Sequence, residues 1–231
     1  MAVGIELARK RQDLIRNSLT RGLNTFSDGL YVVTCNHVHL LTWVPDGTEL
    51  SRAMQYIAGA AGWAYNRRKS RSGSFWSGRY HPALVETGSH LFRCLFYIDM
   101  NRVRARAVEY PSQWRDCGVH ELLGIRQRYR ILNLERLLWC LGMPGQPDDF
   151  RRWYQVTLDE LSRESCHVRE PMWSECAAVG SRDWTERLGS KLVAGRQAIR
   201  EVHVPGALTL ADESASWGLS ASRRATDGLL F

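Results

Sequence analysis

YVVTCNHVHLLTWV, residues 31–44, is the clearest strand-forming stretch of this chain. It is dense in β-branched and aromatic residues and is followed by the turn signal Pro-Asp-Gly at 45–47. The pattern predicts either one β-strand or two strands broken near Asn36. Since alternate side chains share a face of a strand, we expect His37 and His39 to point the same way.

Two imidazoles on one strand face predict a metal site. They would lie ~7 Å apart, close enough to bind one divalent ion at ~2.1 Å from each nitrogen. Two protein ligands leave positions open for a substrate, as in catalytic metal sites. The alternative is a pair of structural histidines with backbone or carboxylate partners. A zinc site that adds Cys35 is disfavoured, because Cys35 and His39 lie ~13 Å apart along a regular strand.

The composition is that of a soluble globular protein of one domain with an appendage. The chain has 231 residues, of which 44% are hydrophobic and 24% charged. No apolar run approaches the ~18 residues that a membrane span needs, and the N-terminus has no apolar signal core. The six cysteines are scattered, which favours reduced, mostly buried thiols. We therefore expect a cytoplasmic protein without a membrane partner.

Positive charge is concentrated in one segment. The net charge is +7 and the pI about 9.3, and residues 63–106 hold nine Lys and Arg against two acids. Aromatic residues lie among these cations. Cations neutralise phosphates and aromatic faces stack on unpaired bases, so the segment indicates nucleic-acid binding. The alternative is a solvated basic face without a ligand.

Periodicity predicts alternating helices and strands over the first half of the chain. The expected order is a helix at 6–21, the strand region 30–44, a helix at 50–65, a basic loop at 67–73, a strand within 75–86 and a helix from Ser89. Residues 107–195 have helical patterns. From residue 205 the chain is rich in Gly, Ser and Ala, which predicts a disordered tail.

The helix from Ser89 carries a second set of polar residues. Its polar arc holds Arg93, Tyr97, Asn101 and Arg104. Its opposite side holds four apolar residues that we expect to pack on the sheet, Phe92, Leu95, Phe96 and Val103. A phenol suits a nucleophile, a carboxamide one turn away suits a metal ligand, and the two flanking guanidiniums suit a phosphate clamp. An ordinary solvated arc is the alternative.

Four motifs occur in the order of a known family. They are NHVHLL at 36–41, NRR at 66–68, SFWSGRY at 74–80 and YIDMNRVRA at 97–105. Over residues 30–120 the chain resembles the single-tyrosine HUH transposases, specifically the REP-associated tyrosine transposases of bacteria. Arg102 and Cys35 stand where members of that family usually have proline.

The resemblance implies an α+β fold, a ferredoxin-like antiparallel sheet with helices on one face. It implies that His37 and His39 lie on a central strand, that Tyr97 is the nucleophile and that Asn101 completes a site for Mg²⁺ or Mn²⁺. The family's first strand, which is central in the sheet, would precede the helix at 6–21, and the chain starts almost at that helix. We therefore expect that strand to be missing.

These observations predict a catalytic domain at 1–120, a helical extension at 121–204 and a disordered tail at 205–231. The expected function is a DNA strand transferase that acts on single-stranded or hairpin DNA in the bacterial cytoplasm, as a monomer or homodimer. The expected DNA-binding residues are Arg67, Arg68, Lys69, Arg71, Trp76, Arg79, Arg93 and Arg104. The alternatives are a non-catalytic DNA-binding relative and an inert remnant.

Overall fold

A computed structural model describes residues 29–44, 47–128, 130–164, 170–194 and 228–230. The first half holds β1 (Gly29–Val33), β2 (Val38–Thr42), α2 (Gly47–Lys69), β3 (Leu84–Glu86), α3 (Ser89–Asp99), α4 (Asn101–Arg104) and the 3₁₀ turn η1 (Pro111–Gln113). The second half holds α5 (Val119–Leu122), α6 (Leu134–Cys140), α7 (Pro147–Arg163), α8 (Met172–Glu175), β4 (Ala178–Val179), α9 (Arg182–Ala194) and β5 (Gly228–Leu230). The predicted mixed α+β class is confirmed, whereas the helix predicted at 6–21 lies outside the described residues.

The strand region predicted at 30–44 forms two antiparallel strands, β1 and β2, broken near Asn36. A tight loop joins them, and Thr34 closes it. The Thr34 backbone N–H donates to the His37 carbonyl at 2.9 Å, and the His37 N–H donates to the Thr34 hydroxyl at 3.0 Å. This loop fixes the point at which the histidine-bearing strand begins.

The sheet contains five strands in the order β1-β2-β5-β3-β4. β5 lies between β2 and β3 and is antiparallel to both, while β3 and β4 are parallel. Residues 228–230 thus hold the central position of the sheet. Residues 205–227 lie outside the described part, and the disordered tail predicted at 205–231 stays a prediction.

Helices cover both faces of the sheet. Alternate residues of β1 point in opposite directions, and each set joins a different apolar cluster. Leu30 and Val32 pack in the cluster that contains α3, whereas Tyr31 and Val33 pack with Ile57 of α2. The expectation of helices on one face is therefore wrong for α2 and α3. The physical reason is that β1 is apolar at every position, so each of its faces needs a cover.

α3 lies between the sheet and α7. Nine of its eleven residues are buried. Phe92 and Phe96 contact Trp153 of α7, with ring centroids 5.1 and 5.8 Å apart. These two phenylalanines thus pack on α7, within the same apolar cluster as Leu30 and Val32 of β1. Tyr97, on the polar arc of α3, is buried as well.

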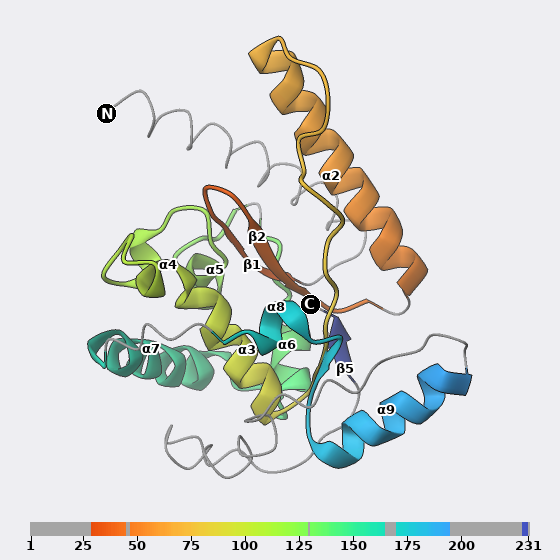
Figure 1. Cartoon of the computed structure of the whole chain (residues 1–231). Helices are drawn as coiled ribbons and strands as arrows, with labels where there is room; N and C mark the ends of the chain where they lie inside the picture. Colours follow the sequence, from red (N-terminus) through yellow and green to blue (C-terminus); the bar gives the residue numbers. More distant parts are fainter. Residues whose placement is uncertain (1–28, 45–46, 129, 165–169, 195–227, 231) are drawn as a thin grey trace.

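α2 projects beyond the sheet, and residues 70–80 run back alongside its C-terminal half (Figure 1). We call residues 58–80 the arm. The Trp76 indole N–H donates to the Ala58 carbonyl at 3.0 Å, and the Asn66 amide donates to the Gly73 carbonyl at 2.8 Å. The helix continues to Lys69, so residues 67–69 form its last turn and not the start of a loop, which corrects the predicted boundary.

The main apolar cluster runs from Leu30 through α3 to Leu158 and Val179. It crosses residue 120, and the predicted division into domains there stays a prediction. Within the described ranges no helix is long and apolar enough to cross a bilayer. Four of the five described cysteines are buried and all five are free thiols, which confirms the prediction for these residues.

Candidate metal and nucleophile site

His37 and His39 lie side by side at the start of β2. Their ring centroids are 4.8 Å apart and the ring planes are nearly perpendicular. His37 is exposed just before the strand, and His39 is half-buried within it on the face that α3 covers. The predicted common orientation of the two imidazoles is thus borne out by their direct ring contact.

A side-chain hydrogen bond fixes the tautomer of His37. Its Nδ1 lies 2.8 Å from the Asn36 Oδ1, which can only accept, so Nδ1 carries the proton. The Nε2 lone pair of the neutral ring is then available. Metal-binding histidines commonly have one ring N–H held by such an oxygen. Asn36 therefore gives His37 the form that binds a metal ion.

The surroundings of both imidazoles lower their pKa and so favour the neutral form. Burial lowers the pKa of His39 to about 3, with further lowering by the neighbouring His37 and by Arg104. Burial and the Arg102 guanidinium lower the pKa of His37. Only a neutral imidazole binds a metal ion, so the lowered pKa values favour the form of each ring that can act as a ligand.

Tyr97 reaches the histidine pair from α3. Its ring centroid lies 5.8 Å from that of His39, in an edge-to-face contact. The Arg104 guanidinium carbon lies 4.1 Å from the Tyr97 ring centroid, and the Trp173 ring contacts it at 5.9 Å. Only 6% of Tyr97 is exposed. Tyr97 is thus near the predicted ligands but buried, which corrects the expectation of an open polar arc.

Asn101 begins α4, one turn after Tyr97. The helical path continues through Met100, because the Met100 N–H donates to the Phe96 carbonyl and the Arg104 N–H donates to the Met100 carbonyl. Asn101 therefore keeps the predicted i, i+4 spacing to Tyr97, and it is half-buried. Its role as a metal ligand stays a prediction.

The donor set partly fits a divalent ion. Two neutral imidazoles and a carboxamide oxygen suit Mn²⁺ or Mg²⁺ with open positions. Among the described residues, no group of three or more His, Cys, Asp and Glu side chains is placed to hold a metal ion. Cys35, His37 and His39 are thus not grouped as a three-ligand site in the described structure. A bound ion would have to share oxygens from the substrate.

The predicted DNA-binding residues fall into two groups. Arg67, Arg68, Lys69, Arg71, Trp76 and Arg79 belong to the arm, whereas Arg93 and Arg104 lie on α3 and α4. The Arg104 guanidinium lies over the Tyr97 ring and donates to the Tyr97 backbone carbonyl. The Arg93 Nε donates to Glu170 at 2.9 Å, so this cation is already paired within the protein.

The sequence analysis assigned no role at this site to Trp173, Glu170 or Arg102. Trp173, 76 positions after Tyr97, covers the tyrosine, and its indole N–H donates to Glu170 at 2.9 Å. Arg102 stacks over Trp114 at 4.2 Å, and its Nε is buried without a hydrogen-bond partner in the described structure. The only sequence feature that singled out Arg102 is that it stands where the similar family usually has proline. The position of Trp173 beside Tyr97 follows from tertiary contacts alone.

No family model matches the chain, and no curated protein or solved structure matches it either.

Proposed function

We propose that the protein is a metal-dependent tyrosine transposase that cleaves and rejoins single-stranded or hairpin DNA. The observation that carries the proposal is the edge contact, at 5.8 Å, between Tyr97 of α3 and His39 of the histidine pair. Residues 58 positions apart in sequence thus meet as a potential nucleophile and a potential metal ligand. The proposal includes the resemblance to the REP-associated family and a ferredoxin-like sheet with β5 at its centre.

Tyr97 would be the nucleophile. Its Oη forms a bond to the phosphorus while the bond from phosphorus to the 3′ oxygen breaks, which leaves a 5′-phosphotyrosine and a free 3′-hydroxyl. The phenol loses its proton and the leaving oxygen gains one. Because a phosphodiester replaces a phosphodiester, rejoining needs no nucleotide energy source.

His37, His39 and Asn101 would hold Mg²⁺ or Mn²⁺. A bound ion of this kind supplies Lewis-acid polarisation of the scissile phosphate. Asn36 orients the His37 ring for binding through its 2.8 Å contact with Nδ1. The Arg104 guanidinium lies over the Tyr97 ring and donates to the Tyr97 backbone carbonyl, which holds the tyrosine in place beside His39.

The buried state of Tyr97 requires an opening step before DNA can reach it. Trp173 contacts its ring, and Glu170 links Trp173 to Arg93 of α3. Separation of the segment 170–173 from α3 would uncover the tyrosine. Conformational steps of this kind commonly precede chemistry in enzymes. The proposed partner is DNA, and the proposed location is the bacterial cytoplasm.

The test is a covalent-adduct assay. The protein is incubated with labelled hairpin and single-stranded oligonucleotides and Mg²⁺ or Mn²⁺, and adducts are resolved on a denaturing gel. We expect a slow-migrating protein–DNA species. His37→Ala and His39→Ala should abolish it and leave single-strand binding within a few fold, because binding rests on distributed cations. Equal loss of binding in these variants would mean that the histidines are structural.

A second candidate is a DNA-binding relative without cleavage activity. The low exposure of Tyr97, at 6%, and its contact with Trp173 favour it, because both hide the nucleophile. Binding of oligonucleotides without any adduct, in either metal and after Trp173→Ala, would select this candidate over the enzyme.

A further inference from the structure

The outer side of α2 carries two large aromatic residues that are at least half exposed. Trp63 is 63% exposed and Tyr56 is 50% exposed. At about 100° per residue they share one arc of about 80° with Arg52, Gly59 and Arg67. We call these five residues the α2 stripe. The sheet-facing side of α2 is distinct and holds the buried Ala53 and Ile57.

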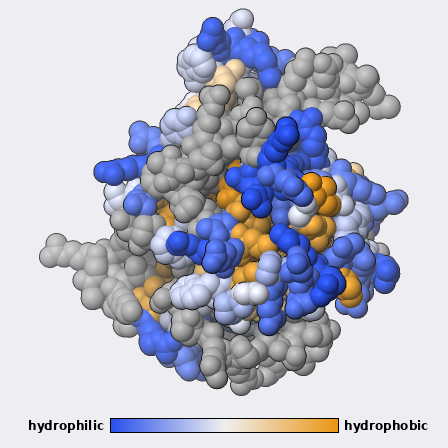
Figure 2. Space-filling view, turned by 180° about the vertical axis from the view of Figure 1, so that it is seen from behind, coloured by the Kyte–Doolittle hydropathy of each residue, from blue (hydrophilic) through white to orange (hydrophobic). Residues whose placement is uncertain are grey.

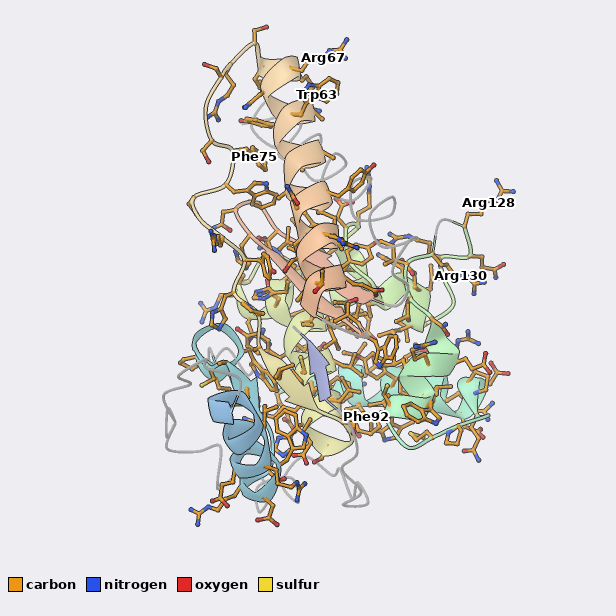
Figure 3. The ribbon with its side chains drawn as sticks, turned by 90° about the vertical axis from the view of Figure 1, so that its right-hand side faces the viewer. Trp63, Arg67, Phe75, Phe92, Arg128 and Arg130 are labelled. Atoms are coloured by element: carbon orange, nitrogen blue, oxygen red, sulfur yellow. The ribbon has the colours of Figure 1, made fainter. Side chains whose placement is uncertain are left out.

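Trp63 and Arg67 of the α2 stripe lie on the side of α2 away from the returning segment of the arm. Figure 3 shows Trp63 and Arg67 on one side of α2 and Phe75, from the returning segment, on the other. Phe75 packs inside the arm against Tyr65 and Trp76, each with ring centroids 4.8 Å apart. The inner aromatic residues thus hold the arm together, while those of the stripe face solvent.

All charged Lys, Arg, Asp and Glu side chains of α2 and the returning segment between residues 50 and 85 are positive. Residues 50–85 contain six Lys and Arg and no Asp or Glu. The Arg67 guanidinium lies 5.1 Å from the Trp63 ring centroid, so a cation accompanies an aromatic face. Figure 2 shows hydrophilic residues over the projecting end of α2, at the top of that view. A ligand for this surface must be anionic and must offer flat apolar faces.

Gly59 sits within the stripe between the two aromatic residues. A glycine in a helix interior costs about 1 kcal/mol relative to alanine. A Cβ at Gly59 would meet no described residue within 4 Å, so packing within the described ranges does not account for this glycine, whereas a Cβ at Gly62 would contact Phe75 at 3.4 Å. The missing side chain leaves the helix backbone accessible to a ligand between Tyr56 and Trp63.

We propose that the α2 stripe is a binding site for single-stranded nucleic acid, with Tyr56 and Trp63 stacking on unpaired bases and Arg52 and Arg67 contacting phosphates. The two rings are ~10 Å apart along the helix, about three base steps at a stacked spacing of ~3.4 Å. Aromatic platforms with interspersed cations are the usual means of binding single strands. The proposal rests on the DNA-binding part of the proposed function and adds a site away from Tyr97.

The test measures binding of full-length protein to a fluorescein-labelled oligothymidylate of about 12 nucleotides by fluorescence anisotropy. Trp63→Ala and Tyr56→Ala should each weaken binding by roughly 5-fold to 150-fold, the range for loss of one stacked base. Trp63→Phe should restore most of the affinity. Trp139→Ala is the matched control, because Trp139 is 58% exposed but lies on α6.

Gly59→Leu provides an independent check. It should raise thermal stability, since leucine favours the helix, yet weaken oligothymidylate binding. A duplex of the same length should bind more weakly and respond little to Trp63→Ala, because its bases are already stacked.

Unchanged affinity in Trp63→Ala and Tyr56→Ala, or an equal loss in Trp139→Ala, would overturn the proposal. Self-association abolished by Trp63→Ala, without an effect on oligonucleotide affinity, would also overturn it and make the stripe a contact between copies. The two proposals can fail separately. If the wild type forms no adduct but Trp63→Ala and Tyr56→Ala lose oligonucleotide binding, the transposase proposal fails and the α2 stripe is supported.

Discussion

α2 and α3 hold most of the candidate functional residues and lie in opposite environments. α2 buries four of its 23 residues and extends past the sheet, whereas α3 buries nine of eleven between the sheet and α7. Exposed cations and aromatic rings on α2 are available to a ligand. On α3, Arg93 and Tyr97 are engaged by Glu170 and Trp173. The contrast supports the proposals that α2 binds nucleic acid and that α3 holds a protected nucleophile.

The largest expected effect is the loss of chemistry on α3. Tyr97→Phe removes only the hydroxyl and keeps the ring that contacts His39, Arg104 and Trp173. Covalent adduct and strand cleavage should vanish while the thermal unfolding midpoint and oligonucleotide affinity stay within error. The adduct gel and anisotropy measure these two properties.

Tyr65→Phe on α2 is the matched control for Tyr97→Phe. Tyr65 stacks against Phe75 within the arm and should tolerate loss of its hydroxyl without loss of cleavage. A covalent tyrosine adduct that persists in Tyr97→Phe would assign the nucleophile elsewhere.

The next largest effect is a difference in how much alanine substitutions on α3 and on α2 lower the free energy of unfolding. Ile98→Ala on α3, where the side chain is fully buried, should lower the free energy of unfolding by about 2–5 kcal/mol. Trp63→Ala on α2 should change it by less than about 0.5 kcal/mol. Urea unfolding followed by circular dichroism measures both. A cost for Trp63→Ala comparable with that of Ile98→Ala would show that the stripe packs against another part of the chain.

A pH effect on stability is expected from α3. Burial raises the pKa of Asp99 from 3.8 to about 7, partly offset by the hydrogen bond from Tyr154. Between these two pH values the folded state holds a proton that the unfolded state has lost. The contribution of Asp99 is therefore complete below about pH 4 and is lost as pH rises towards 7.

Asp99→Asn should remove this loss, because asparagine stays neutral and still accepts from Tyr154. The variant should gain stability relative to wild type as pH rises from 4 to 8, by up to a few kcal/mol at about 1.4 kcal/mol per pKa unit. Thermal unfolding at several pH values measures the difference. Parallel profiles for the two proteins would mean that Asp99 titrates normally in the folded state.

The smallest effect concerns the salt dependence of binding. Each phosphate neutralised on a single strand contributes ~0.7 to the slope of log affinity against log salt. Arg67→Gln, Arg68→Gln and Lys69→Gln should each lower the slope by about that amount. Arg93→Gln should leave it unchanged, because Arg93 is paired with Glu170. A reduced slope in Arg93→Gln would instead place DNA across α3.

Local pattern was sufficient for several elements. The break near Asn36, the helix after residue 47 and the start of α3 at Ser89 agree with the sequence analysis to within a few residues. In α2 the buried residues Leu50, Ala53, Ile57 and Ala61 follow helical spacing and lie on one side. This succeeds because α2 is covered on one side only, so hydrophobic periodicity and burial coincide.

The same reasoning failed for α3. Its polar arc was predicted to lie on a surface, either as a reactive group or as a solvated arc, yet Tyr97 is buried. The cover comes from α7 and from Trp173, which lie more than 45 residues further along the chain. Periodicity reports the polarity of a helix face but not the distant element that packs on it.

The sequence by itself determined the histidine pair, its place at the start of a strand and the concentration of cations near α2, because side-chain alternation and composition are local properties. The tertiary structure decided which groups meet. It brought Tyr97 to His39, paired Arg93 with Glu170 and left Trp63 exposed. Such contacts depend on which apolar faces bury one another across the whole chain, and no local pattern encodes that choice.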